Sequence, residues 1–179
     1  MRRALAALFG GAVGKDTVHA LLGYLEDAFL LCPVALATES ERRRNSNPRK
    51  LYPVDPGLAA AFDVSGRPNT GHALETVVLH EADRRSADVG YVKTAQGLEV
   101  DFLLRVPGAA PELIQVCADV SDPGTLEREV RALQAASAEH PRATRRLLVL
   151  DRDQIPSRPV AGIRIQPAYE WLLDGPGGE

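Results

Sequence analysis

The chain has 179 residues, 45% of them hydrophobic, and a net charge of −3 at pH 7. It is long enough for one good-sized domain or two small ones, but no apolar run approaches the ~20 residues that a membrane-spanning helix needs. Its two cysteines, Cys32 and Cys117, are too few and too far apart for a disulfide framework or a zinc site, which fits a reducing cytoplasm.

The first predicted element is a short amphipathic helix over residues 3–9, followed by a glycine-rich turn. The stretch "GGAVGKDT" (10–17) looks like a phosphate-binding loop, but that motif requires glycine where Phe9 stands and a hydroxyl residue where Asp16 stands. No nucleotide is therefore expected in this chain. The glycines are interpreted as a turn between two helices.

A second helix and a β-hairpin come next. Apolar residues from Val18 to Phe29 keep helical spacing, with Asp16 or Thr17 as the expected cap. "LLCPVAL" and "KLYPV" are predicted as two strands joined by the polar loop "TESERRRNSNPRK". Two helices, a tight turn and a hairpin with a basic tip predict a small winged helix-turn-helix segment over residues 1–60.

The tip of this hairpin is the most basic part of the chain. Residues 1–54 carry eight Lys and Arg against five Asp and Glu, whereas the remainder carries thirteen against nineteen. The candidate nucleic-acid-binding residues are Arg42, Arg43, Arg44, Arg49 and Lys50. Such residues can lie against the phosphates of DNA or RNA, although a solvated hairpin tip has the same composition.

After the hairpin the pattern alternates between helices and strands. We expect a short helix over "DPGLAAAF" and a longer one over "HALETVVLHEADRRS". A hairpin that turns at Ala95–Gly97 follows them, and then a further strand over "PELIQVCADV". Asp122 is expected to cap an amphipathic helix, followed by the strands "RRLLVLD" and "GIRIQP" and the closing helix "AYEWLL". This order predicts an α/β domain with a mixed sheet flanked by helices over residues 61–174, then a loose tail over 175–179.

The second hairpin, which turns at Ala95–Gly97, carries the charged residues that are the best candidates for a catalytic site. Successive strand residues point to opposite faces, so Glu99 and Asp101 share the face opposite Val100, Phe102 and Leu104. Lys93 is expected opposite Glu99 and could place an ammonium group in the same pocket, or form a plain cross-strand ion pair with it. Glu75 falls within the apolar arc of its helix, where a carboxylate needs a partner.

A helix glutamate, a strand aspartate and a following Gln-x-Cys together resemble the PD-(D/E)XK, or restriction-endonuclease-like, nuclease core. The resemblance implies that Glu75, Asp101 and Gln115 gather Mg²⁺, a hard cation that prefers oxygen ligands. Cys117 stands where the family carries its catalytic lysine, and a thiol supplies no positive charge there. The resemblance therefore implies a degenerate site, unless Lys93 replaces the missing lysine.

The whole chain resembles a more specific family. The blocks "TVHALLGYLEDAFLL", "PRKLYPVDPGLAAAF", "GHALETVVLHEADRR", "GLEVDFLL", "ELIQVCADVSDPGTLEREVRAL" and "AYEWLL" follow one another as in the C-terminal domain of unknown function of prokaryotic AAA+-type ATP-binding proteins. The ATPase module of that family is absent here. The chain is therefore expected to be a fragment or a standalone remnant, and not to hydrolyse ATP by itself.

Three functions remain open at this point. The first is a nuclease-like, nucleic-acid-associated accessory domain of an ATPase, with a weakened or lost metal site. The second is an active Mg²⁺-dependent nuclease that uses Glu75, Asp101, Gln115 and Lys93. The third is a protein-interaction module that docks an ATPase partner without contacting nucleic acid. None of the three involves a membrane.

Overall fold

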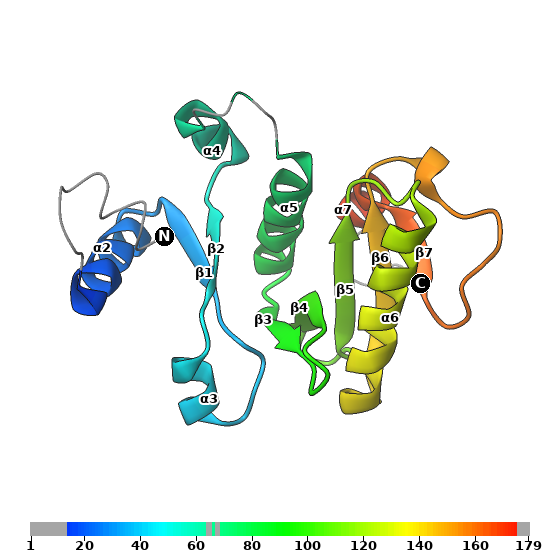
Figure 1. Cartoon of the computed structure of the whole chain (residues 1–179), viewed down its shortest axis with the longest axis horizontal. Coiled ribbons are helices and arrows are strands. Elements are labelled where there is room, and N and C mark those ends of the chain that lie inside the picture. Colours follow the sequence, from blue (N-terminus) through cyan, green and yellow to red (C-terminus); the bar gives the residue numbers. More distant parts are fainter. Residues whose placement is uncertain (1–13, 64–65, 67–68, 175–179) are drawn as a thin grey trace.

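The computed structural model describes residues 14–63, 66 and 69–174 (Figure 1). The helix predicted over residues 3–9, most of the glycine turn and the tail over 175–179 lie outside the described residues. The described chain is mixed α/β, with a two-stranded hairpin near its beginning and a five-stranded mixed sheet flanked by helices.

The N-terminal part is built around the hairpin. Its strands pair antiparallel, with Cys32 opposite Tyr52. The elements are α2 (Lys15–Asp27), β1 (Leu31–Val34), α3 (Glu41–Ser46), β2 (Lys50–Pro53) and α4 (Pro56–Phe62).

Two local expectations in this part were wrong. Helix α2 begins at Lys15 after Gly14, rather than behind a cap at Asp16 or Thr17. The stretch predicted as a basic loop contains helix α3, because the Ser40 side chain accepts a hydrogen bond from the Arg43 N–H and caps a first turn.

The large sheet has the strand order β3-β4-β5-β6-β7. The pairs β3–β4 and β4–β5 are antiparallel, whereas the pairs β5–β6 and β6–β7 are parallel. The predicted cap Asp122 is confirmed, and Asn69 caps α5; each accepts a hydrogen bond from a backbone N–H in the first turn. The elements are α5 (Thr70–Arg84), β3 (Asp88–Lys93), β4 (Glu99–Arg105), β5 (Glu112–Cys117), α6 (Pro123–Glu139), β6 (Thr144–Val149), the 3₁₀ turn η1 (Arg152–Gln154), β7 (Arg164–Pro167) and α7 (Ala168–Leu173).

Two apolar clusters cover the two faces of this sheet. On one face Val78, Leu79 and Ala82 of α5 and Trp171 of α7 pack against alternate residues of β4, β5 and β6. On the other face Leu133 and its neighbours on α6 pack against the intervening residues. Figure 1 shows α5 and α6 well apart, with the sheet strands between them. This arrangement matches the predicted sheet with helices on both faces.

A bulge in β4 changes the predicted alternation of side chains. Gly90 pairs with Leu103 and Val92 with Val100, so one residue of β3 faces two residues of β4 at this point. As a result Val100 packs on the α6 face while Phe102 packs on the α5 face, which corrects the expectation that they share a face. The predicted pairing of Lys93 with Glu99 is confirmed.

The N-terminal part adds to the edge of the large sheet through the segment after β1. Ala35 accepts a hydrogen bond from the Tyr91 N–H, and the Ala37 N–H donates to the Tyr91 carbonyl oxygen. Gly90 permits this approach, because a Cβ at that position would lie 2.9 Å from the Ala37 Cβ. The hairpin is therefore held against β3 by main-chain hydrogen bonds as well as by side chains.

Within the described residues, none of the helices combines the length and apolar character that crossing a bilayer would require.

Candidate functional site

Asp101 lies where β4 and β5 separate. The two strands pair from Leu104 opposite Glu112 to Phe102 opposite Ile114. Next to that last pair, hydrogen bonds to side chains take the place of the main-chain ladder. One Asp101 carboxylate oxygen (Oδ2) accepts a hydrogen bond from the Val116 N–H at 3.0 Å, while the Asp101 N–H donates to Gln115 Oε1 at 3.2 Å. Asp101 is only 7% exposed, so these bonds keep a buried carboxylate in place.

The other Asp101 oxygen pairs with a lysine from the N-terminal hairpin. Lys50 Nζ lies 2.8 Å from Asp101 Oδ1 and 2.9 Å from Glu99 Oε1, and its ammonium is 5.8 Å from the centroid of the Tyr91 ring. Burial alone would lower the pKa of Lys50, but attraction to the Asp101 and Glu99 carboxylates outweighs it and raises the pKa. Lys50 is thus a charged group that bridges two carboxylates across the hairpin–sheet contact.

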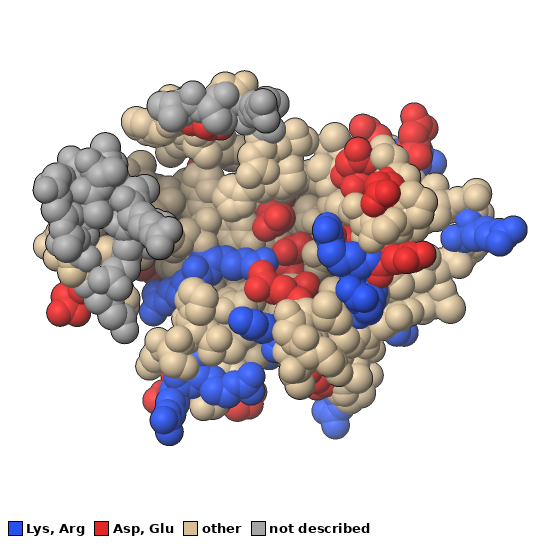
Figure 2. All heavy atoms as spheres, viewed as in Figure 1, with Lys and Arg blue, Asp and Glu red and all other residues tan. Residues whose placement is uncertain are grey.

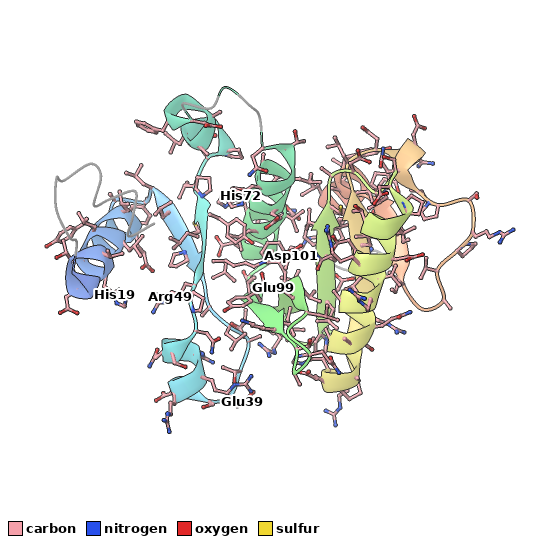
Figure 3. The ribbon with its side chains drawn as sticks, viewed as in Figure 1. His19, Glu39, Arg49, His72, Glu99 and Asp101 are labelled. Atoms are coloured by element: carbon pink, nitrogen blue, oxygen red, sulfur yellow. The ribbon has the colours of Figure 1, made fainter. Side chains whose placement is uncertain are left out.

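Glu75 lies on α5, about one turn after His72. Figure 3 shows the labelled His72 above Asp101 and Glu99. The Tyr52 hydroxyl donates to Glu75 Oε2 at 2.8 Å, and the Tyr52 ring stacks on the His72 imidazole with centroids 5.2 Å apart. Burial, followed by the negative charge of Asp101, raises the pKa of Glu75 to about 7. Burial, with the Glu75 charge next to it, also raises the pKa of Tyr52, which therefore stays a hydrogen-bond donor.

Gln115 connects Asp101 to helix α6. Its amide nitrogen (Nε2) donates to Glu129 Oε2 at 2.8 Å, and the exposed Arg128 guanidinium holds the other Glu129 oxygen at 2.6 Å. Glu129 is 6% exposed, so both hydrogen bonds compensate for burying its charge. Gln115 therefore faces α6, whereas Glu75 lies on α5, which packs against the opposite face of the sheet.

The predicted site residues are partly gathered. The Asp101 N–H donates to the Gln115 side chain, and the Asp101 carboxylate lies near enough to Glu75 to raise the pKa of Glu75. Lys93 is exposed, and its ammonium forms no ion pair with a described residue. The Cys117 thiol donates to the Asp119 carbonyl oxygen, and burial raises the pKa of this thiol.

Sequence reasoning missed the groups that complete this cluster. The sequence places Lys50 among the nucleic-acid contacts and predicts no role for Tyr52, His72 or Glu129. Strand alternation in "KLYP" was the available signal, because it places Lys50 and Tyr52 on one face. The partners of that face lie 51 and 23 residues away along the chain, so the pattern could not identify them.

The remaining basic residues lie on the hairpin tip. Arg42, Arg43, Arg44 and Arg49 are all exposed, and Arg44 donates to the Thr38 carbonyl oxygen at 2.9 Å. Figure 2 shows basic side chains over α3 and the lower part of β2, immediately beside the acidic side chains gathered near α5 and β4.

The predicted metal ligands do not fit a Mg²⁺ ion. Both Asp101 oxygens accept hydrogen bonds, from Lys50 and Val116, and the Gln115 oxygen accepts from the Asp101 N–H. The ammonium of Lys50 lies between the carboxylates of Asp101 and Glu99, where a cation would be held. Among the described residues no group of three or more His, Cys, Asp or Glu side chains is placed to hold a metal.

Comparisons with protein-family models, with curated proteins and with solved structures gave no match. What the molecule does must therefore be inferred from its own side chains and their surroundings.

Proposed function

We propose that this chain is a nuclease-like, nucleic-acid-associated accessory domain that has exchanged its metal ion for the internal ammonium of Lys50. The observation that carries the proposal is the position of this ammonium, within 3 Å of both the Asp101 and the Glu99 carboxylates. A fixed ammonium supplies the positive charge that the carboxylates need, but it cannot lower the pKa of a bound water as a metal ion does.

The order of elements supports the restriction-endonuclease-like part of the proposal. Helix α5, the antiparallel strands β3, β4 and β5, helix α6 and strand β6 follow one another as in the nuclease core that the sequence resembles. Asp101 lies on the middle strand of the antiparallel set, and Glu75 on the helix before it. The hairpin β1–β2 with helix α2 supports a winged-helix-like segment in front of this domain.

The partners proposed are DNA or RNA, and an AAA+-type ATPase module in the cytoplasm. The exposed arginines of the hairpin tip support the first partner, since their guanidinium groups face solvent, where phosphates can reach them. The ATPase module rests on the sequence resemblance alone, and the chain itself is proposed to hydrolyse no ATP.

A plasmid-cleavage assay with Mg²⁺ or Mn²⁺ tests the loss of catalysis. We expect no nicking or linearisation at high protein concentration, and no difference between the wild type and Asp101→Ala. Cleavage by the wild type that disappears in Asp101→Ala would refute the proposal.

An active Mg²⁺-dependent nuclease is the second candidate function. It is favoured by the presence of Glu75, Asp101 and a lysine in one cluster, which are the side-chain types of a phosphodiesterase site. The lysine in this cluster is Lys50, because Lys93 is exposed. The same cleavage assay decides between the two candidates.

Association with nucleic acid is tested separately by a gel shift at several salt concentrations. Phosphate contacts make the affinity fall steeply with salt. A protein-interaction module without nucleic-acid contact, the third function open from the sequence, would give no shift even at low salt.

A further inference from the structure

A groove of about 720 Å³ lies on the outer side of the hairpin, away from the carboxylates of Asp101 and Glu99. Helix α2 forms one wall and the stretch from α3 to the start of β2 forms the other. Its apolar floor consists of Val18, Leu22, Leu31, Pro33 and Leu51. Arg44, Asn45, Asn47 and Arg49 lie along the α3 side, and His19 and Glu26 along α2.

Strand β2 separates this groove from Lys50 and its ion-pair partners Asp101 and Glu99. Side chains of a strand alternate between its two faces, so Arg49 and Leu51 line the groove while Lys50 and Tyr52 point to the sheet. Figure 3 shows this division, with Arg49 and His19 on the α2 side of β2 and Glu99 and Asp101 on the other side. Two adjacent cationic residues therefore serve different surfaces.

The lining of the groove suits a single strand of nucleic acid. Arg44 and Arg49 can contact backbone phosphates, while the aliphatic floor offers apolar surface to unstacked bases. A duplex presents phosphates on its outside and keeps its bases stacked, so its bases would make no contact with the apolar floor of the groove. Glu26 carries a negative charge at the α2 side, so the phosphates are expected to follow the α3 side.

We propose that this groove binds single-stranded DNA or RNA, with Arg49 and Arg44 contacting its phosphates. This inference rests on the proposed association with nucleic acid and names the surface and the strand state. It also implies that a bound strand lies on the opposite face of β2 from Asp101 and Glu75. The carboxylate cluster then has no contact with the phosphates in the groove, in agreement with the proposed absence of cleavage.

Fluorescence anisotropy tests the groove with a labelled DNA of about 12 nucleotides, within the usual site size of single-strand binders, and with the same RNA sequence and the DNA duplex. The variants are Arg49→Gln, Arg44→Gln and Arg131→Gln. Arg131 is an exposed arginine on α6, on the other side of the large sheet, and its replacement removes the same charge. All proteins are compared from low to moderate salt.

We expect Arg49→Gln to weaken single-strand binding by about 5- to 10-fold and to reduce the slope of log K against log salt by about 0.7, the value for one phosphate contact. Arg131→Gln should match the wild type, and the duplex should bind more weakly than either single strand. DNA and RNA of equal affinity would indicate backbone recognition, and a preference for RNA would indicate contact with the 2′-hydroxyl. Either result supports the groove.

Two results would overturn this inference while leaving association with nucleic acid intact. One is wild-type affinity and salt slope in both Arg49→Gln and Arg44→Gln. The other is tighter binding to the duplex than to single strands. No binding by the wild-type protein to any of the three probes would instead refute the proposed association itself, and with it the groove.

Discussion

Replacing Lys50 with methionine measures how much the internal ammonium contributes to the fold. The Lys50 and Asp101 side chains are 21% and 10% exposed, and removal leaves Asp101 buried with only the Val116 N–H as a partner for its carboxylate. Breaking a buried ion pair from one side costs about 3–5 kcal/mol. Because Lys50 is partly solvated and Asp101 keeps one hydrogen bond, we expect a loss of about 2–3 kcal/mol.

The second ion pair of Lys50 adds little to this loss. The Glu99 side chain is 46% exposed, so water can replace its ammonium partner and the pair contributes at most about 0.5 kcal/mol. The matched control is Lys93→Met, which removes an exposed lysine of the strand next to β4 and should stay within about 0.5 kcal/mol of the wild type.

The free energy of unfolding is measured by urea denaturation at pH 8, with circular dichroism as the probe of unfolding. The pKa of Lys50 is raised in the folded protein, so the stabilisation from its charge is fully present below the unfolded value of 10.5 and is lost as pH rises through the folded value. The stability difference between wild type and Lys50→Met should therefore shrink above pH 10.5. Equal stability of Lys50→Met and Lys93→Met at pH 8 would refute the internal-cation interpretation.

Three other changes probe the surroundings of this lysine. Burial and Asp101 raise the folded pKa of Glu75 from 4.5 to about 7, so wild-type stability should fall as pH rises through that window and remain lower above it. Glu75→Gln should be close to neutral at pH 4.5 and stabilising by about 1–2 kcal/mol at pH 8, and urea curves showing the same difference at both pH values would contradict this reasoning. Gln115→Leu removes the donor to buried Glu129 and should cost about 2–4 kcal/mol in thermal or urea unfolding, whereas a neutral effect would mean that water reaches this carboxylate. Gly90→Ala places a Cβ 2.9 Å from a Cβ of the docked segment, so it should cost about 2 kcal/mol or more and speed trypsin cleavage in α3, while Gly23→Ala, with open space around it, should do neither.

Local signals in the sequence predicted most of the elements of the described fold. Asn69 and Asp122 mark helix starts, and Gly97, with a positive φ of 80°, marks the hairpin turn. Helix α3 was missed because "ERRRNS" has no apolar face, and its formation depends on a serine cap and not on burial. The β4 bulge could not be predicted, because "EVDFLLR" contains no glycine or proline that would indicate an irregular strand.

The candidate site was harder to predict because its contacts span long sequence distances. Glu75 and Asp101 were identified, since a carboxylate in an apolar arc or on a core strand stands out locally. The lysine beside them was sought on the adjacent strand at Lys93, but it comes from Lys50 in the N-terminal hairpin. Only the docking of one part of the chain against the other determines that choice.

The docking of residues 35–37 beside Tyr91 also bears on how the chain can be divided. These residues cover part of the outer edge of β3, and Tyr52 of the same hairpin is 1% exposed against the sheet. A shortened protein starting near residue 61 would uncover a strand edge and an aromatic surface together, a combination that favours self-association. We therefore expect the parts on either side of the predicted boundary near residue 60 to unfold together, and the sheet expressed alone to aggregate.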